Sequence, residues 1–545
     1  MIKRLARFVP LLLALAWLWG GLFSTLQASI AANQGRLVYA LDDAYIHMAM
    51  AKNMARHGVW GVTRHGFSST SSSLLWTLAL SAAYALFGAG EAVPFIFNFF
   101  LATVLILTLF YVLNRLRVRP GPATLWLLVF VGAVPWVYLT FGGLEHVLHH
   151  LATLLYGAAA AAVLCDEKGA SRPVRAALMG LAAVLVLTRF EGIFPVLVVT
   201  GLLLLRRRLG QAIGNLVAGG MPLLVYGLIS LANGWYFLPS SVLLKGHRPD
   251  LSTLKGMLGF VYAGLRQLVY NIHILVVVLA VLFLIWRTLG RERSFWRPGV
   301  VLGALFLATV LLHMFFARSG FYLNRVSQIR YDAYLITLGL FAVLHLLARR
   351  SDGPAPPGRH AWLVAGLGIL VLLPLAEWGL QADRQVVVAT RNIHDQQYQM
   401  GRFLARYYPQ ESVVANDIGA INFLADIRCF DIWGLASRDI ADAVLARTYS
   451  SREISRLAAD AGAVIAVVYD YPFHFKTMGG IPPGWTRVAA WTIADNVVCA
   501  ADTVSFYALN RSEIPRLLAA LARFSAELPP GVRERGHHLR LREGG

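Results

Sequence analysis

Long apolar runs are the feature of this sequence that most constrains its fold. They recur along the first 380 positions, and most approach the roughly 18–24 residues with which a helix crosses about 30 Å of hydrocarbon. Hydrophobic residues make up 57% of the 545 residues and charged residues 14%, whereas soluble domains are about a quarter charged. We therefore predict a multi-pass α-helical membrane protein with spans at residues 10–31, 93–114, 123–141, 146–165, 176–188, 192–205, 211–231, 272–286, 299–316, 331–348 and 361–380.

Short basic clusters between these runs predict the orientation. They are Lys3/Arg4/Arg7, Arg115/Arg117/Arg119, Lys168/Arg172/Arg175, Arg206/Arg207/Arg208, Arg287/Arg291/Arg293/Arg297 and Arg349/Arg350/Arg359. Because cytoplasmic loops are enriched in Lys and Arg, we place all six on the cytoplasmic side. The apolar stretch Leu74–Phe87 would break the alternation as a full span, so we interpret it as a juxtamembrane or re-entrant helix. This leaves about eleven spans in a plasma (inner) membrane, with the N-terminus cytoplasmic and the C-terminal domain periplasmic or otherwise extracytoplasmic.

The net charge of +20 is explained mainly by these clusters, so no nucleic-acid partner is expected. Two parts of the topology have an alternative. The first span has a basic start and small residues near its end, which are also features of a cleaved signal peptide, although its apolar region is long for one. Spans 176–188 and 192–205 are short, and the alternative is that the loop between them dips into the membrane.

After Asp383 the chain becomes polar and alternates between helical and strand-like segments. The expected helices are Asn392–Tyr407, Ser451–Ala461 and Ser512–Glu527, and the expected strands are Ser412–Asn416, Arg428–Ile432, Ala463–Tyr469 and Val497–Leu509. We predict a membrane domain at 1–383, a small soluble α/β domain at 384–530 and a basic flexible tail at 531–545. Cys429 and Cys499 fall in strand-like runs, and the sequence leaves open whether they pair in an oxidising compartment or remain buried thiols.

Two adjacent carboxylates, Asp42 and Asp43, follow the first span in the predicted first outer loop, residues 33–92. Apolar Ile46, Met50 and Met54 recur every four residues, which predicts an interfacial helix. One Asp is enough to cap that helix, so a second one favours chemistry. Paired carboxylates act as general bases or hold a divalent cation, and we leave the metal role of this pair open.

Other ionisable residues lie on the same outer side in this topology. They are Glu145, His146, Arg189, Glu191, Lys245, His247, Arg248, Arg318, Arg325, Arg330 and Asp332. Ionisable groups at membrane depth are expensive and indicate function, although a single one has a structural alternative, such as pairing of Arg330 with Asp332. Together, Arg and Lys suit a phosphate, and a carboxylate beside a phosphate site indicates transfer from a phosphate-linked donor.

Two further sequence features bear on the chemistry. The run Phe67–Trp76 is rich in Ser and either supplies a helix cap and loop or lines a polar acceptor pocket. P-loop, dinucleotide-binding, CxxC and HExxH motifs are absent, so no ATP, nicotinamide or catalytic zinc is expected. No cofactor is predicted beyond the open divalent cation.

Several motifs, in this order, resemble the signature of integral-membrane GT-C glycosyltransferases. They are Asp42-Asp43-Ala-Tyr-Ile, Phe67-Ser-Ser, Gly142-Gly-Leu-Glu-His, Thr188-Arg-Phe-Glu-Gly, the stretch Pro239–Lys245 and Arg330-Tyr331. Within the class, the chain is most similar to the mycobacterial arabinofuranosyltransferase branch. The segment that begins Val414-Ala-Asn-Asp-Ile resembles the soluble domain of that branch.

The resemblance implies inverting transfer of a sugar, with arabinofuranose as one candidate, from a polyprenyl-phosphate donor. The acceptor would be a cell-envelope glycan, lipid or protein. In the family, an Asp of the first outer loop orients or deprotonates the acceptor. That role falls here on Asp42, with Asp43 as the second choice. Residues implied in donor binding are Tyr45, Glu145, His146, Arg189, Lys245, His247, Arg325 and Arg330. Phe190 and Glu191 replace the Pro and Asp often found in relatives, which leaves the acceptor open.

Two other classes of function compete with the glycosyltransferase. A transporter or lipid flippase predicts inverted repeats and ionisable groups near the bilayer midplane, but no similarity between halves is found. A non-catalytic scaffold that binds envelope glycan would need only the 384–545 domain. The sugar, the acceptor, the linkage and the oligomeric state do not follow from the sequence.

Overall fold

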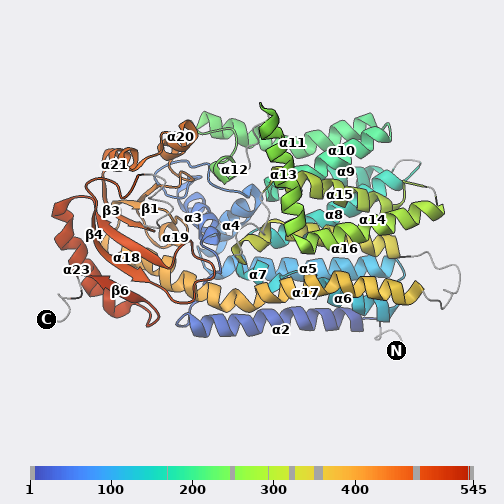
Figure 1. Cartoon of the computed structure of the whole chain (residues 1–545), viewed down its shortest axis with the longest axis horizontal. Coiled ribbons are helices and arrows are strands. Elements are labelled where there is room, and N and C mark those ends of the chain that lie inside the picture. Colours follow the sequence, from blue (N-terminus) through green and yellow to red (C-terminus); the bar gives the residue numbers. More distant parts are fainter. Residues whose placement is uncertain are drawn as a thin grey trace.

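A bundle of long helices and a mixed β-sheet occupy opposite ends of the molecule (Figure 1). The computed structural model describes residues 7–167, 170–245, 252–292, 294–317, 326–348, 360–469, 479–537 and 539. The bundle consists of α2 (Val9–Ala32), α5 (Ala92–Arg115), α6 (Pro120–Ala133), α7 (Trp136–Phe141), α8 (His146–Cys165), α9 (Arg172–Thr188), α10 (Ile193–Leu205), α11 (Leu209–Ala232), α14 (Ile272–Glu292), α15 (Pro298–Phe316), α16 (Ala333–Leu347) and the first part of α17 (His360–Ile393).

The apolar runs form the helices of a multi-pass membrane protein, as predicted. Within the described residues, six helices are long and apolar enough to cross a membrane by length and composition, and four shorter apolar helices accompany them. Their outer faces expose large apolar side chains, including Phe100, Tyr111 and Leu228, which in a membrane would face lipid. The count of eleven spans stays a prediction.

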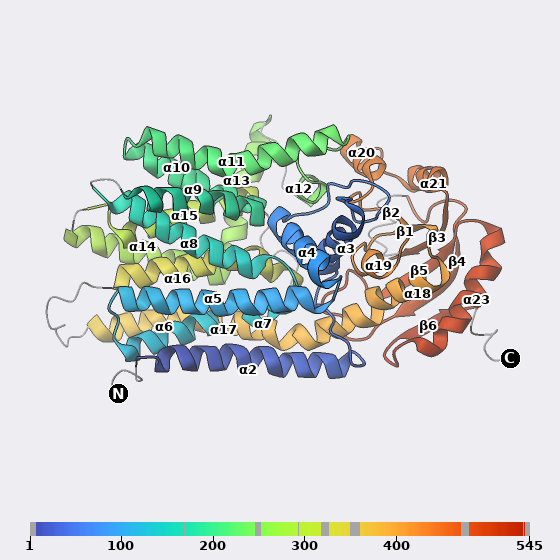
Figure 2. The same cartoon turned by 180° about the vertical axis from the view of Figure 1, so that it is seen from behind.

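The two ends of the bundle carry different elements, and its orientation in a membrane stays a prediction. The helix junctions next to Arg115, Arg206 and Arg297 lie at the same end as the N-terminus (Figure 2). The helices α3 (Asp42–His57) and α4 (Leu74–Phe87) and the sheet lie at the other end. Residues 74–87 thus form a helix beside α3, and its juxtamembrane position stays a prediction.

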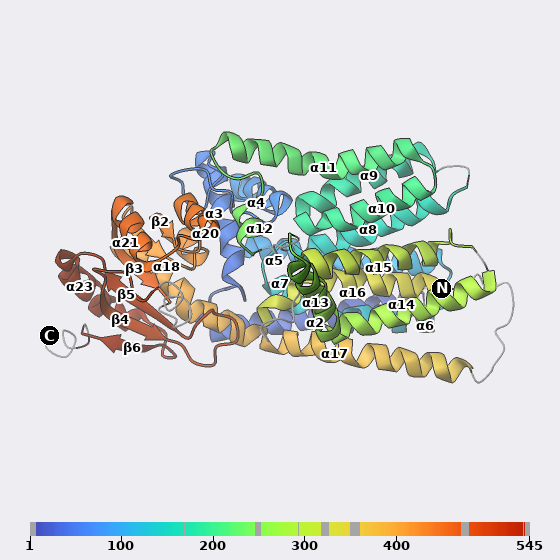
Figure 3. The ribbon, with the colours of Figure 1, turned by 45° about the horizontal axis from the view of Figure 1, so that its top comes forward.

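Two of the helices that differ from those predicted lie across the bundle or lead out of it. Helix α13 (Leu254–Tyr270), which was not predicted, lies steeply across the bundle (Figure 3) and packs Phe260 against Phe315 of α15. Helix α17 is continuous through residue 383, where we predicted the domain boundary, and it leads through a π-helical turn, η4 (His394–Tyr398), into α18 (Gln399–Tyr407). A helix therefore connects the bundle to the sheet.

The C-terminal domain contains a six-stranded sheet in the order β2-β1-β3-β5-β4-β6. Its strands are β1 (Ser412–Ala415), β2 (Arg428–Asp431), β3 (Ala463–Val468), β4 (Thr486–Thr492), β5 (Thr503–Ala508) and β6 (Arg533–Gly536). Strands β2, β1 and β3 are parallel, and the remaining pairings are antiparallel. Side chains alternate between the two faces: Val413 packs in the core with α18 and α23 (Ile514–Phe524), whereas Val414 packs with α20 (Arg438–Ala446) and α21 (Ser451–Asp460).

Four of these strands were predicted, and β4 and β6 were not. The prediction of a flexible tail at 531–545 is wrong for Arg533–Gly536, which pair with β4. Residues 538 and 540–545 lie outside the described residues. Cys429 and Cys499 are free thiols in the structure as described, which is the alternative to a disulfide bond between them.

Candidate active site

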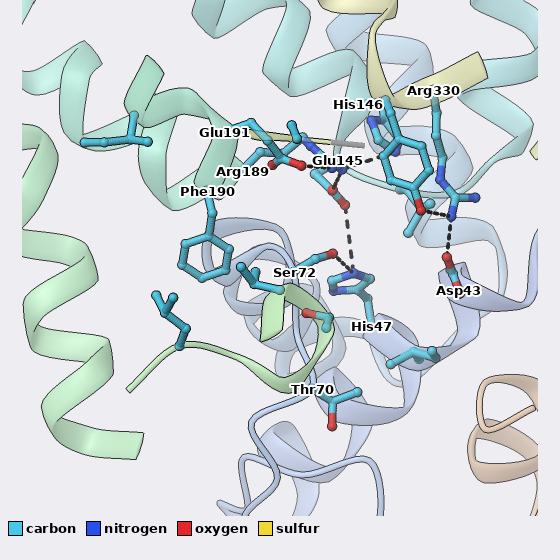
Figure 4. A pocket seen from close by; sticks show the side chains of 18 of the residues that line it. Asp43, His47, Thr70, Ser72, Glu145, His146, Arg189, Phe190, Glu191 and Arg330 are labelled. Atoms are coloured by element: carbon cyan, nitrogen blue, oxygen red, sulfur yellow. Dashed lines mark hydrogen bonds and ion pairs between the residues drawn. The ribbon is translucent and has the colours of Figure 1, made fainter. Parts of the chain in front are cut away.

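A cavity of about 320 Å³ lies where α3 meets the bundle (Figure 4). Its polar wall carries Asp43, His47, Thr70, Ser72, Glu145, His146, Arg189, Glu191, Arg330 and Tyr331, and its other walls are largely apolar. Leu435 from the C-terminal domain also lines it, and the Leu435 carbonyl accepts a hydrogen bond of 2.9 Å from the Thr70 hydroxyl. Both domains therefore contribute to the cavity, and residues far apart in the sequence meet there.

Asp43 and Arg330 form an ion pair in this cavity. The Nη2 of Arg330 donates to the Oδ2 of Asp43 and, over 3.1 Å, to the hydroxyl of Tyr331. Only 6% of the Arg330 side chain is exposed, whereas 34% of the Asp43 side chain is exposed. Arg330 comes from the 3₁₀ helix η3 (Val326–Tyr331) and Asp43 from the first turn of α3. The predicted alternative pairing of Arg330 with Asp332 is not the one that forms.

A second buried cluster forms the adjoining wall. Arg189 follows the last residue of α9 and lies between two carboxylates, with Nη1 2.6 Å from Glu145 Oε1 and Nη2 2.9 Å from Glu191 Oε1. The Nε2 of His146 lies 3.4 Å from the same Nη1. Since two carboxylates already neutralise Arg189, this cluster carries no excess positive charge.

His47 is a cavity residue that the sequence analysis missed. It lies one helical turn after Asp43 on α3, with Nδ1 2.8 Å from Thr77 Oγ1 and Nε2 3.4 Å from Ser72 Oγ and 3.9 Å from Glu145 Oε2. Burial lowers the pKa of His47 below its usual 6.5, which favours the neutral ring. The spacing of four residues from Asp43 places both side chains on one helix face, and this is the signal that would have found His47.

The Ser-rich run caps a helix and contributes to the cavity, and its role in an acceptor pocket stays a prediction. Ser73 caps α4 by accepting a hydrogen bond from the Trp76 amide, and Thr70 and Ser72 line the cavity.

Asp42 does not share this environment with its neighbour. Its Oδ2 accepts from the amide of Gly419 and its Oδ1 from the amide of Ala420, both at 2.8 Å. These amides begin α19 (Ala420–Leu424) in the C-terminal domain. Burial, and then the charge of Asp417, raises the pKa of Asp42 to about 8, although the two amide bonds oppose the shift. Asp42 therefore joins the two domains.

Lys52 reinforces the same contact from the other end of α3. Its ammonium donates to the carbonyl of Asn422 at 3.0 Å and to that of Phe423. Burial lowers the pKa of Lys52 to about 8. Asp42 thus binds amides at the start of α19 and Lys52 binds carbonyls near its end, so α3 contacts both ends of this short helix.

Of the other residues predicted to bind the donor, Tyr45 does not line the cavity. The side chains of the rest lie outside the residues that the structure describes. The Tyr45 hydroxyl accepts from the backbone amide of Tyr39 at 3.3 Å, and its ring packs against Tyr398 and Phe423. Lys245 ends α12 (Ser240–Lys245), and its side chain is outside the described part. His247, Arg248, Arg318 and Arg325 lie wholly outside it.

The structure gives Asp42 and Asp43 different partners, so the predicted pair does not converge on one cation. Within the described ranges, no group of three or more His, Cys, Asp or Glu side chains is arranged to hold a metal ion.

Comparisons with known proteins establish the fold. A crystal structure of ArnT from Cupriavidus metallidurans in the apo state aligns with a TM-score of 0.50 and 15% identity, covering 92% of this chain and 99% of that chain. The same protein bound to undecaprenyl phosphate aligns with a TM-score of 0.50 and 14% identity, covering 91% and 98%. The chain therefore has a GT-C-like fold, a multi-pass helical bundle followed by a small α/β domain.

Other matches add little to this assignment. The cryo-EM structure of the arabinofuranosyltransferase AftD from Mycobacteria aligns with a TM-score of 0.39 and 12% identity, covering 91% of this chain and 40% of that chain. A TM-score this low does not support the predicted similarity to the arabinofuranosyltransferase branch. A family model described as "Domain of unknown function (DUF8728)" matches residues 391–507. Among curated proteins, none matches this sequence.

Proposed function

We propose that this protein is a membrane glycosyltransferase that moves a sugar from a polyprenyl-phosphate donor to a cell-envelope glycan, lipid or protein outside the cytoplasm. The observation that carries the proposal is the cavity itself, where a partly exposed carboxylate, Asp43, lies beside a buried guanidinium, Arg330. A general base and a phosphate-binding cation are the two groups that such a transfer needs from the protein.

The mechanism assigns the base to Asp43 rather than to Asp42, because both carboxylate oxygens of Asp42 are bonded to α19. Asp43 accepts the proton of the acceptor hydroxyl as its oxygen forms a bond to the anomeric carbon of the donor sugar. The bond between that carbon and the phosphate oxygen breaks, and its electron pair leaves with the phosphate. Arg330 stabilises the departing phosphate. A single displacement of this kind inverts the anomeric configuration.

The apolar walls suit the lipid part of such a donor. Phe194, Leu223, Leu238, Val242 and Phe316 also line the cavity and belong to the helix-rich part of the chain. A polyprenyl chain lying against them would place its phosphate toward Arg330. The structure of ArnT bound to undecaprenyl phosphate, which shares this fold, supports a lipid phosphate of that class as the ligand. Arabinofuranose stays one candidate for the sugar, on the sequence resemblance alone.

The test is a transfer assay with the purified full-length chain in liposomes. A panel of polyprenyl-phosphate sugars is offered with extracted envelope glycans and lipids as acceptors, with and without a chelator. Release of polyprenyl phosphate together with a new glycosidic linkage is the expected result. Movement of the lipid across the bilayer without sugar transfer would favour a flippase instead and overturn the proposal.

A further inference from the structure

Asp43, the proposed base, and Arg330, the proposed phosphate-binding cation, form an ion pair with each other. Nη2 of Arg330 donates to Asp43 and to Tyr331, whereas Nη1 has no hydrogen-bond partner within the described part of the structure, although it is buried. A buried guanidinium nitrogen without a partner is costly. Arg330 is therefore poised to accept a further anionic ligand from the cavity.

The pairing has a consequence for Asp43. A carboxylate whose charge is engaged by a guanidinium in a partly buried setting is a poor proton acceptor, because protonating it would break the ion pair. Asp43 would serve as a base only after Arg330 turned to another anion. The phosphodiester of such a donor carries one negative charge, like a carboxylate, and its two free oxygens accept the paired donors of Arg well.

The other cation of the cavity wall does not offer this exchange. Arg189 is held by Glu145 and Glu191, so a phosphate would have to approach a cluster that already carries two carboxylates. Among the residues that the structure describes, Arg330 pairs with one carboxylate, that of Asp43. Among the described residues of the cavity, Asp43 and Arg330 thus form the ion pair that an incoming phosphate would break by binding to Arg330.

We propose that Arg330 masks Asp43 until the phosphate of the lipid donor binds to Arg330, so that donor binding itself produces the active base. The inference rests on the proposed function and adds an order to it: the donor binds first and the acceptor is deprotonated second. When the lipid phosphate leaves, the ion pair forms again and the base is masked.

Binding of undecaprenyl phosphate to the detergent-purified full-length chain, measured by native mass spectrometry, tests this exchange without knowledge of the sugar or the acceptor. Asp43→Asn removes the competing charge but keeps the side-chain shape, so it should bind the lipid phosphate about tenfold more tightly. Arg330→Gln should bind it more weakly. In the double variant, Asp43→Asn should no longer tighten binding, because there is no guanidinium left to release.

Two controls separate this effect from a general change in the protein. Asp42→Asn alters the adjacent carboxylate, which faces α19 rather than Arg330, and should not tighten binding. Undecaprenol, which lacks the phosphate, should bind all variants alike. Unchanged or weaker binding of undecaprenyl phosphate by Asp43→Asn overturns this inference alone. If the unaltered protein does not bind undecaprenyl phosphate, the proposed function fails and takes the inference with it.

Discussion

At the scale of single residues, Asp42 and Asp43 show how helix geometry separates neighbours. Consecutive residues of an α-helix point about 100° apart, because one turn takes 3.6 residues. Asp42 therefore reaches the amides of Gly419 and Ala420, while Asp43 reaches Arg330. Two carboxylates that look like one catalytic pair in the sequence have separate environments, and we expect them to have separate roles.

The buried Glu145–Arg189–Glu191 cluster leads to a prediction about stability. Arg189→Gln should lower the free energy of unfolding by about 3–5 kcal/mol, because it leaves Glu145 as an uncompensated buried charge. Thermal unfolding in detergent measures the loss. Adding Glu145→Gln to this variant should recover part of it. A stability unchanged by Arg189→Gln would show that the ion pairs of this cluster do not contribute as the structure suggests.

The sequence predicted part of this site because its cues are local. Asp43, Glu145, His146, Arg189 and Arg330 were singled out as ionisable groups at membrane edges, and the structure places all of them on one cavity. The bonds of Asp42 could not be predicted in this way, since its partners are separated from it by 377 and 378 positions. No periodicity or spacing rule reports a contact across that distance.

At the scale of elements, α3 and α19 form the contact that joins the domains, and Gly419 makes their close approach possible. A Cβ atom on Gly419 would lie 2.1 Å from the Asp42 carbonyl oxygen. We expect Gly419→Ala to destabilise this contact by about 1–3 kcal/mol, which faster hydrogen exchange of the α19 amides would reveal. Gly180→Ala in α9, where a Cβ meets nothing within 4 Å, is the control and should be neutral or slightly stabilising. Equal exchange in both variants would contradict the packing described.

The pKa of Asp42 makes the same contact depend on pH. Burial, followed by the charge of Asp417, raises it from 3.8 to about 8, so the native protein holds a proton that the unfolded chain releases. The resulting stabilisation is complete below about pH 4 and is lost as the pH rises through about 8. The unfolding temperature should fall from pH 5 to pH 8 more steeply in the unaltered protein than in Asp42→Asn. Parallel profiles would show that Asp42 is not the titrating group.

Elements with a strong local pattern were predicted, and those that depend on distant partners were not. Helix α5 follows from one long apolar run. Helix α13 contains Lys255 and Arg266 among its apolar residues and has no such run. Strand β6 is Arg-Glu-Arg-Gly and exists because β4 provides an edge for it. A polar tetrapeptide does not indicate a strand until its partner is known.

At the scale of the whole molecule, α17 leads from the bundle through η4 and α18 to the sheet, and both parts contribute residues to the cavity. The C-terminal domain is therefore expected to be needed for a complete site. A fragment that begins at residue 384 would start inside α17 and would lack Asp43 and Arg330, so the proposal predicts no transfer by it.

The orientation of the molecule is a separate prediction. Arg523→Cys on α23 should react with a membrane-impermeant maleimide in intact cells, whereas Arg172→Cys at the start of α9 should react only after lysis. The unaltered chain, with its own three cysteines, is the blank. The reverse labelling pattern would place the cavity on the cytoplasmic side and contradict the positive-inside assignment.

The role of Asp43 as the base is tested by the initial rate of sugar transfer. The unaltered protein, Asp43→Asn and Asp42→Asn are compared with the donor and acceptor that the panel identifies. Loss of a general base costs about 10²–10⁴-fold in rate. We predict a loss of that size for Asp43→Asn, with undecaprenyl phosphate binding retained, and a much smaller loss for Asp42→Asn. Full activity of Asp43→Asn, or a larger loss in Asp42→Asn than in Asp43→Asn, would contradict it.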